Sequence, residues 1–460
     1  MRIRVAPFRA AAVALMCSAS PRAGKHPRAS AAVAGGVHSL LKTIDNSLKT
    51  DLSGDPKSDY PNHDTREVVD AHWVEVCRHR PISCALARGL PPLAHPCGLT
   101  TPSQVGPQPL ASPYLISVSP AMAASLGVDP EAEPEAFARY FSGDLDSFAE
   151  AQRPWATPYA VSVFGQPIPS PDPFGRGNAY GDGRACSLGE FVGGGGERWE
   201  LQLKGSGTTP FSRRGDGRAV LRSSVREYLV SEAMEAMGVP TTRALCLVAS
   251  KTQYTQRMWY AADDTGRHDH PPDTLVSERC AITCRAAPSF LRVGHVELHS
   301  RRAMRKEEGA AEKLAEFVRY AIGREFPEID TAAPLATQAI EMLRAFARRQ
   351  AETVTAWVRV GYVQGNMNSD NCLLSGRTMD YGPFGFVEEY SELWTPFTSD
   401  MEAKFGFERQ PLAAQAKTRL HSTIASSFSA ALATHPLSPR AGERDDARPR
   451  AHPALRRRWP

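Results

Sequence analysis

The stretch RWELQLKGSGTTPFSRRGDGRAVLRSSVREYLVSEAMEAMG (198–238) changes from the pattern of a strand to that of a helix. Apolar and polar residues alternate over 199–203, so Lys204 is expected on the face of a strand opposite the apolar side chains. From Leu221 onward, apolar residues recur at helical spacing, and Gly238 suits the end of that helix. The stretch therefore predicts a strand, a connection rich in Gly and Arg, and a helix.

Residues 184–205 predict a β-hairpin whose turn is the glycine run 193–196. A glycine run can also form a phosphate-binding loop. However, the pattern GxxxxGK[ST] is missing from the sequence, and the spacing of Gly175, Gly177 and Gly181 misses GxGxxG by one residue. We therefore interpret the glycines as a turn.

Lys204 on the strand and Glu227 on the following helix form the first candidate site. A strand lysine paired with a helix glutamate is how kinase-like enzymes hold the phosphates of a nucleotide. The alternative to this ion pair is a role for Glu227 within its own helix. Ser224 and Glu227 have the spacing of a capping box, in which Ser224 caps the helix. The spacing alone leaves both interpretations open.

The segment QGNMNSDNCLLSGRTMDYGPFGF (364–386) contains the second candidate site. Asp370 is a candidate base, and Asn371 and Asp380 supply oxygen ligands suited to a divalent ion that bridges phosphates. Asn and Asp next to Gly are also common turn residues, so a turn is the alternative.

The segment CRAAPSFLRVG (284–294) contains two arginines, whose planar guanidinium groups suit phosphate oxygens. The spacing of Arg285 and Arg292 would place both on one face of a helix, but Pro288 argues for a bent or partly extended segment. Two solvated arginines are the simpler alternative.

The rest of the chain predicts a strand-rich half followed by a helix-rich half, which is the α+β class. The expected elements are a strand and a helix within 111–130, the helix running from Ser119 to Gly127, a buried strand at 244–249, and long helices at 310–323 and 336–361.

The composition argues against several classes of function. Of the 460 residues, 42% are hydrophobic and 23% are charged, as in ordinary globular proteins, and a net charge of +4 gives little support to a nucleic-acid surface. No apolar run is long enough to span a membrane. The nine cysteines are scattered, which favours a reducing compartment, and Cys280 and Cys284 lack the spacing of a zinc motif.

Taken together, these segments resemble the selenoprotein O family. The similar strings are GDGRACSLGE (181–190), 200–245, CRAAPSFLRVG and NMNSDNCLLSGRTMDYGPFGF, in the family's order, with flanking blocks that extend the resemblance over about 110–410. The resemblance implies a protein-kinase-like fold of two lobes that transfers AMP from ATP to Ser, Thr or Tyr hydroxyls of protein substrates and releases diphosphate. The chain would be a divergent eukaryotic member without the C-terminal selenocysteine.

The resemblance also implies roles for individual residues. Glu227 would hold Lys204, Asp370 would accept the hydroxyl proton, and Asn371 and Asp380 would bind Mg²⁺, with Mn²⁺ as an alternative. The residues implied in nucleotide binding are Gly181, Gly183, Arg184, Lys204, Asp216, Gly217, Arg285, Arg292 and Asp380. No motif specifies an oligomeric state.

Four departures from the family's pattern bear on activity. The family's tract YAGHQFG is YAVSVFG (159–165) here, the loop over 165–181 is longer, the family's His-Gly is Gln364-Gly365, and the chain beyond about 420 does not resemble the family. These departures leave open an impaired, nucleotide-binding pseudokinase. An ordinary protein kinase is disfavoured because the sequence has neither the Gly-rich loop nor the HRD motif.

We expect five segments along the chain. They are a disordered transit peptide (1–44), a loosely structured arm (45–110), a strand-rich nucleotide-binding lobe (111–250), a helical catalytic lobe (251–424) and a disordered basic tail (425–460).

Residues 1–44 contain Arg and Lys but no acidic residue, which is typical of a mitochondrial transit peptide and places the protein in the matrix. The short apolar run 10–19 keeps a secretory signal as an alternative. Another organelle, or an untargeted tail on a cytoplasmic protein, is the remaining interpretation.

A fluorescent protein fused behind residues 1–44 is expected to co-localise with mitochondria, because the import potential acts on a positively charged, acid-free segment. The control is the same fusion with the arginines of the segment changed to glutamine, which should stay diffuse. Secretion of the parent fusion, or a diffuse signal from it, would contradict the transit-peptide hypothesis.

Overall fold

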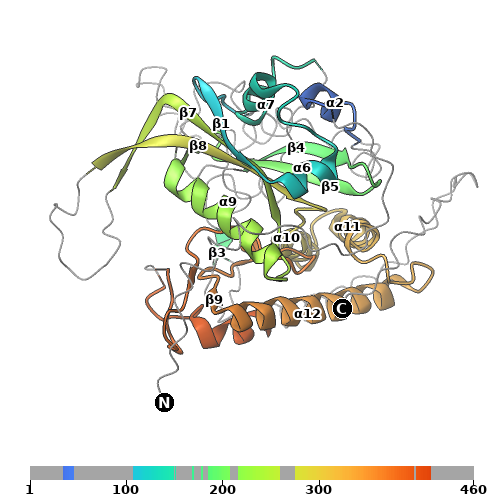
Figure 1. Ribbon diagram of the computed structural model, residues 1–460. Helices are drawn as coiled ribbons and strands as arrows, with labels where there is room; N and C mark the ends of the chain where they lie inside the picture. Colours follow the sequence, from blue (N-terminus) through green and yellow to red (C-terminus); the bar gives the residue numbers. More distant parts are fainter. Residues whose placement is uncertain are drawn as a thin grey trace, which may run out of the picture.

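The computed structural model describes residues 35–45, 107–149, 151, 168–169, 178–179, 185–207, 216–258, 275–397 and 400–415. These residues form an antiparallel sheet and a set of helices (Figure 1), so the predicted α+β class is confirmed. None of the helices in the described part combines the length and the apolar composition that a membrane span requires.

The central sheet has six strands, which pair antiparallel in the order β1-β7-β8-β5-β4, with β6 against β8. The strands are β1 (Pro113–Val118), β4 (Ala185–Val192), β5 (Arg198–Lys204), β6 (Ala219–Val220), β7 (Arg243–Met258) and β8 (Leu275–Ala287). Two short pairs lie outside this sheet, namely β2 (Ile168–Pro169) with β3 (Asn178–Ala179) and β9 (Tyr362–Val363) with β10 (Gly385–Phe386).

The predicted hairpin is present as β4 and β5, and the glycine run forms its turn, with Gly196 in the left-handed region at φ 82°. Leu201 and Leu203 are fully buried on one face of β5, and Lys204 lies on the other face. The alternation in the sequence therefore placed the lysine correctly.

The sheet extends to Ala287, so the change from strands to helices predicted at residue 250 is wrong. The last eight residues of β8, Cys280–Ala287, are all buried. A strand buried on both faces shows no alternation of apolar and polar residues, which is why the pattern did not reveal it.

The helices begin and end close to their predicted positions. Ser119 caps the first predicted helix by accepting a hydrogen bond from the Met122 N–H, and Gly127 ends it in the left-handed conformation. The helices are α2 (Val37–Leu41), α6 (Pro120–Leu126), α7 (Pro134–Phe141), α9 (Leu221–Ala236), α10 (Val293–Met304), α11 (Ala310–Glu325) and α12 (Leu335–Val360), with short 3₁₀ turns at Ser369–Asn371 and Phe407–Arg409.

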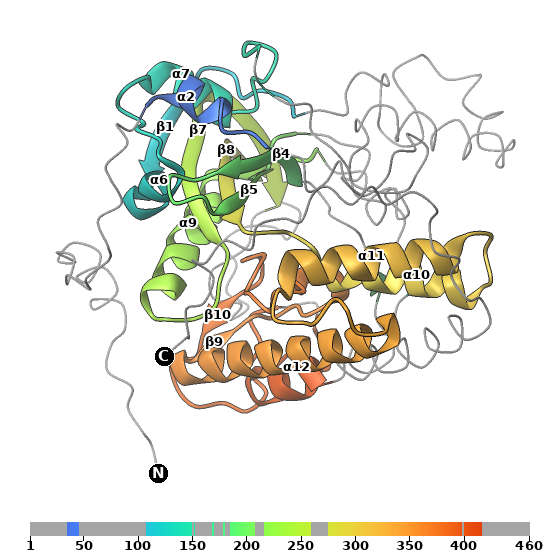
Figure 2. The same cartoon turned by 90° about the vertical axis from the view of Figure 1, so that its right-hand side faces the viewer.

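The helices α10, α11 and α12 gather on one side of the sheet, away from α2, α6 and α7, while α9 lies against the sheet between them (Figure 2). The apolar side chains follow this division. One buried cluster includes Phe141, Phe191 and Leu203 of the sheet side, and a second includes Phe317 and Trp357 of the helical side.

The segment 35–45 is packed against the sheet side, which differs from the disorder expected up to residue 44. Val37 and Leu40 of α2 are buried in the sheet-side cluster, and Ile44 pairs with Phe191 as an isolated bridge. Apolar residues at helical spacing in α2 account for this packing. Residues 1–34, most of the arm over 45–110 and the tail over 425–460 lie outside the described residues.

The alternative interpretation, in which Ser224 caps α9, is wrong. The N-cap is Val220, and no side chain in the described part caps the first turn. Val220 still pairs with Cys280 in the sheet, so the helix begins directly at the end of β6, one turn before the hydroxyl of Ser224 could act as a cap.

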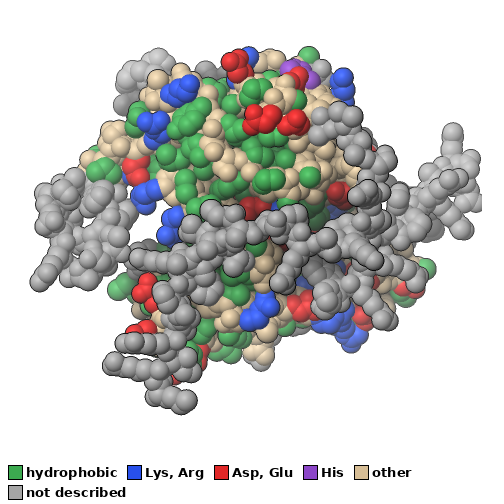
Figure 3. All heavy atoms as spheres, viewed as in Figure 1, with side chains coloured by type: hydrophobic (Ala, Val, Ile, Leu, Met, Phe, Trp, Pro, Cys, Tyr) green, Lys and Arg blue, Asp and Glu red, His purple; other side chains and the backbone are tan. Residues whose placement is uncertain are grey.

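The surface and the cysteines agree with the composition. On the face drawn in Figure 3, Lys and Arg side chains are interspersed with Asp and Glu among the described residues. The cysteines in the described part are Cys186, Cys246, Cys280, Cys284 and Cys372, all of them buried thiols.

Candidate functional site

Four charged side chains from separate parts of the chain meet at the end of β5. Lys204 Nζ lies 2.6 Å from a Glu227 carboxylate oxygen and 2.5 Å from Asp380 Oδ1. Arg285 lies 2.5 Å from Glu227 and 2.7 Å from Asp380. Each cation therefore bridges both carboxylates, and the ion pair expected between Lys204 and Glu227 is present.

The register of the sheet explains why the two cations share a face. Lys204 pairs with Thr283, and Gln202 pairs with Arg285 on the neighbouring strand β8. Paired residues lie on the same face of a sheet, as do residues two apart on one strand, so Lys204 and Arg285 point the same way. Helix α9 packs against this face and brings Glu227 to it.

Burial of the two carboxyl groups would by itself raise their pKa values. The charges of Arg285 and Lys204 outweigh this effect at Glu227 and hold its pKa below the ordinary value. The charges of Lys204 and Arg285 likewise hold the pKa of Asp380 well below its ordinary value. Both carboxylates are therefore ionised at neutral pH, and the four charges balance.

Asp380 occupies a strained backbone position, with φ at 62° in the left-handed region. The Gln364 amide supports it, because Nε2 donates to the carbonyl oxygens of Met379 at 2.8 Å and Asp380 at 3.3 Å. Tyr362 donates its hydroxyl to Gln364 Oε1 at 2.5 Å, and Gln410 Oε1 accepts from the Gln364 N–H at 3.0 Å. Gln364, noted above as a departure from the family's His, is thus a buried and fully bonded anchor for Asp380.

The predicted base, Asp370, lies in the 3₁₀ turn Ser369–Asn371 and is buried. Ser369 donates its hydroxyl to Glu297 on α10, which fixes the start of this turn. The segments around Arg292 and Leu373 run side by side, with the Val293 N–H on the Cys372 carbonyl at 2.9 Å. The structure thus brings Arg292 beside the segment that follows Asp370.

Asp216 and Gly217 lie next to the end of β5, since the Gly207 N–H donates to the Gly217 carbonyl at 3.2 Å. Asp216 receives two hydrogen bonds of 2.8 Å from Arg257 and one of 2.6 Å from Thr255. Burial opposes ionisation there, but these hydrogen bonds lower the pKa of Asp216 to about 2. Arg257 was not anticipated, because nothing in the local sequence relates β7 to residue 216.

The remaining predicted nucleotide ligands, Gly181, Gly183 and Arg184, lie outside the described residues. The described residues contain no cluster of three or more His, Cys, Asp or Glu side chains of the kind that encloses a metal ion. The donor chemistry nevertheless fits magnesium, which is usually held by one or two protein oxygens plus phosphates and water. Both ion pairs of Asp380 use Oδ1, which leaves Oδ2 outside these pairs.

A strand lysine paired with a helix glutamate and with an aspartate from a distant segment is typical of proteins that bind nucleotide phosphates. The family model described as protein adenylyltransferase SelO matches residues 97–439, so the chain belongs to this family.

Relatives named protein nucleotidyltransferase YdiU are similar to the chain. The protein of Xanthomonas oryzae pv. oryzae strain PXO99A is 43% identical over 312 residues, which cover 67% of this chain and 54% of the relative. The protein of Azoarcus sp. strain BH72 is 42% identical over 312 residues with the same coverage, and that of Aromatoleum aromaticum is 38% identical over 376 residues, covering 80% and 60%. The chain thus spans between 54% and 60% of the length of these relatives.

Replacing Gln364 with Leu is expected to lower the free energy of unfolding by several kcal/mol, because each buried group left without its hydrogen bond costs about 1–3 kcal/mol. Urea denaturation followed by circular dichroism measures this change. The matched control is Gln256→Leu, at an exposed position on β7. Equal midpoints for the two variants would show that the Gln364 amide does not support Asp380.

Proposed function

We propose that the chain is a protein adenylyltransferase, which transfers AMP from ATP to Ser, Thr or Tyr hydroxyls of proteins and releases diphosphate. The observation that carries the proposal is the network of Lys204, Glu227, Arg285 and Asp380 in a chain of the SelO family. The name of the relatives, protein nucleotidyltransferase, supports the same reaction class.

We propose that the fold is kinase-like, with the sheet and α9 as one lobe and α10 to α12 as the other. The two separate apolar clusters and the grouping of the helices in Figure 2 support this division. Residues 288–292, which connect β8 to α10, would then link the lobes, with Arg285 on the strand before the link and Arg292 as its last residue.

Within this proposal, Lys204, Arg285 and Arg292 bind phosphate oxygens, and Glu227 keeps Lys204 in place. Positioning and charge stabilisation are most of what nucleotidyl transfer requires of a protein. Gly181, Gly183, Arg184, Asp216 and Gly217 would contact the rest of the nucleotide, and Arg257 would keep Asp216 oriented.

Asn371 and Asp380 would hold a magnesium or manganese ion, which when bound offsets negative charge on the phosphates. Asp370 would accept the proton of the acceptor hydroxyl as its oxygen bonds to the α-phosphorus. The bond from that phosphorus to the bridging oxygen then breaks, and diphosphate leaves with the bonding electrons.

A nucleotide-binding protein without transferase activity is the second candidate function. The balanced network favours it, because Lys204 and Arg285 are each already paired with two carboxylates and a phosphate must compete for them. The same network in an active enzyme would have to exchange partners when ATP binds.

Incubation of the purified chain with protein substrates and α-labelled or γ-labelled ATP separates the candidates. We expect label on protein from the α position only, and we expect Lys204→Ala to lose it because the phosphates lose their cation. Lys251→Ala, at an exposed position on β7, is the matched control and should label normally. Transfer of γ-label would indicate a kinase, and no transfer of either label would indicate the binding protein.

Asp370 and Asp380 are proposed to do different jobs, so their alanine variants should differ. Asp380→Ala should lose affinity for magnesium-ATP. Asp370→Ala should bind magnesium-ATP normally but transfer AMP about 10² to 10⁴ times more slowly, the usual contribution of a general base. Calorimetric titration beside initial rates measures both quantities. If both variants lose binding equally and Asp370→Ala has no separate rate defect, Asp370 is not the base.

We also propose that the protein acts in mitochondria, on the composition of its first residues. Because residues 35–45 pack against the sheet side, a segment that is removed on import would have to end before Gly35, earlier than the predicted residue 44.

A further inference from the structure

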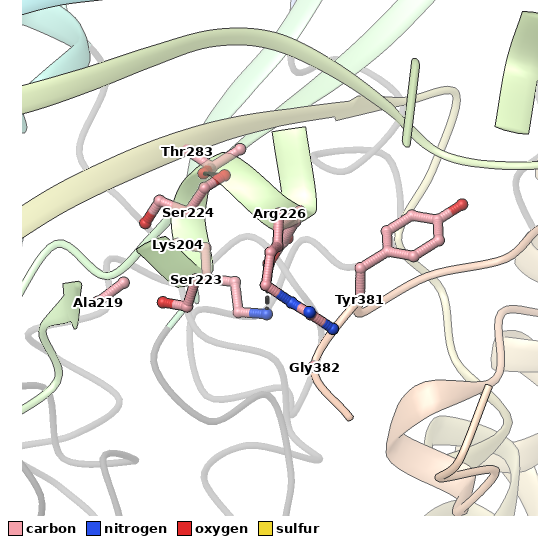
Figure 4. A pocket seen from close by; sticks show the side chains of 9 residues that line it. Lys204, Ala219, Ser223, Ser224, Arg226, Thr283, Tyr381 and Gly382 are labelled. Atoms are coloured by element: carbon pink, nitrogen blue, oxygen red, sulfur yellow. Dashed lines mark hydrogen bonds and ion pairs between the residues drawn. The ribbon is translucent and has the colours of Figure 1, made fainter. Parts of the chain in front are cut away.

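A small cavity of about 80 Å³ lies beside Lys204, on the side of the first turn of α9. The polar and charged residues that line it include Lys204, Ser223, Ser224, Arg226, Thr283 and the carboxylate of Glu227, and Gly382 also borders it. In Figure 4 the Lys204 amine lies between the Ser223 hydroxyl and the Arg226 guanidinium, below the start of α9, while the Tyr381 phenol points away.

The helix that borders the cavity presents an uncapped N-terminus. Helix α9 has 16 residues, begins at Leu221 and has no side-chain cap among the described residues. The first N–H groups of a helix have no acceptor within the helix, and the aligned peptide dipoles favour negative charge there. The hydroxyl of Ser223 turns back to the Val220 carbonyl at 2.9 Å and accepts nothing from the first turn.

The hydroxyl of Ser224 independently indicates that a hydrogen-bonding partner is missing from the cavity. Its side chain is 2% exposed, and its hydroxyl makes no hydrogen bond to any described residue. Buried hydroxyl groups are hydrogen-bonded in the large majority of cases. Thr283 does not supply the partner, because its hydroxyl donates to the Ser224 carbonyl oxygen instead, at 3.3 Å. A polar group from outside the chain would satisfy the hydroxyl of Ser224.

Arg226 gives the cavity its uncompensated positive charge. Lys204 is matched by Glu227 and Asp380, but none of the ion pairs among the described residues includes Arg226. Its guanidinium donates to the Phe384 carbonyl at 3.0 Å and lies 4.5 Å from the centre of the Phe384 ring. Partial burial, and then the neighbouring Arg222, lower the pKa of Arg226.

The size of the cavity restricts the anion. A cavity of roughly 150 Å³ is what a benzene ring occupies in an engineered protein core, so this cavity is too small for a purine base. A phosphoryl group is compact, carries negative charge and accepts several hydrogen bonds, which are the properties that the lining calls for.

We propose that Arg226, Ser224 and the first turn of α9 form a phosphate subsite that takes the terminal phosphoryl group of the diphosphate part of ATP and holds it when diphosphate leaves. This inference rests on the proposed function and extends it, since it assigns phosphate binding to side chains beyond Lys204 and Arg285. Lys204 and Glu227 line the subsite and also belong to the carboxylate network, and their ion pair leaves Arg226 as the unpaired charge in the lining.

Calorimetric titration of the full chain with inorganic diphosphate tests the subsite without any turnover. Arg226→Gln should weaken diphosphate binding roughly tenfold or more, because it removes a charge-assisted contact. Arg222→Gln is the matched control and should bind like the parent. It removes a charge one turn earlier on the same helix, from a residue that is exposed and paired with Glu278 outside the cavity.

Ser223→Asp gives a second test that does not depend on the stability of the Arg226 variant. An acidic residue in the first turn stabilises a helix, so thermal unfolding should stay unchanged or shift upward. The same carboxylate would face the incoming anion, so diphosphate binding should be lost. If this turn had only a structural role, Ser223→Asp would not abolish diphosphate binding while it keeps or raises the unfolding temperature.

The subsite is overturned if the parent does not bind diphosphate, or if Arg226→Gln and Ser223→Asp bind it within twofold of Arg222→Gln. The outcome is separable from that of the proposed function. A chain that shows the expected differences in diphosphate affinity but transfers no AMP keeps the subsite and loses the activity. A chain that transfers AMP with unchanged affinities in both variants keeps the activity and loses the subsite.

Discussion

The pairing of Lys204 and Arg285 with Glu227 and Asp380 is the interaction on which the rest of the structure depends. Removing ions from water costs several kcal/mol each, and the cost is recovered only when every charge is matched at close range. The four residues come from β5, β8, α9 and the segment after β9, so these elements must reach their final positions together. Loss of any one member leaves an uncompensated buried charge.

Several neutral hydrogen-bonding groups hold the backbone at Asp380 in place. Its left-handed backbone is held by Gln364, which is in turn held by Tyr362 and Gln410. The segment just before it is fixed by Thr378, which receives a hydrogen bond from the Trp357 indole at 2.7 Å. A strained residue persists only where its surroundings determine its position, and here helix α12 and residues 407–410 contribute to that support.

The sequence predicted those features whose cause is local. Alternation placed Lys204, and helical spacing placed α11 and α12, because one face of each element is buried and the other is not. It did not predict the strand around Arg285, which is buried on both faces, or the start of α9, which the pairing of Val220 in the sheet decides. The contacts of Asp216 with Arg257 and of Gln364 with Gln410 join residues far apart in the chain, and no local pattern records them.

The balance of charge determines how such a site could change partners. Glu227 and Arg285 are almost completely buried, with side chains 6% and 5% exposed, whereas the side chain of Asp380 is 25% exposed. Phosphate oxygens that arrive from solvent would therefore meet the pair of Lys204 with Asp380 before the pair of Lys204 with Glu227. If a phosphate oxygen replaced Asp380 as the partner of Lys204, the lysine would stay paired with Glu227. The side of its ammonium group that Asp380 had covered would then contact the phosphate. The four charges of the network cancel, so a net attraction for an anion has to come from a cation outside the network. Arg226, which lines the cavity beside Lys204, is such a cation.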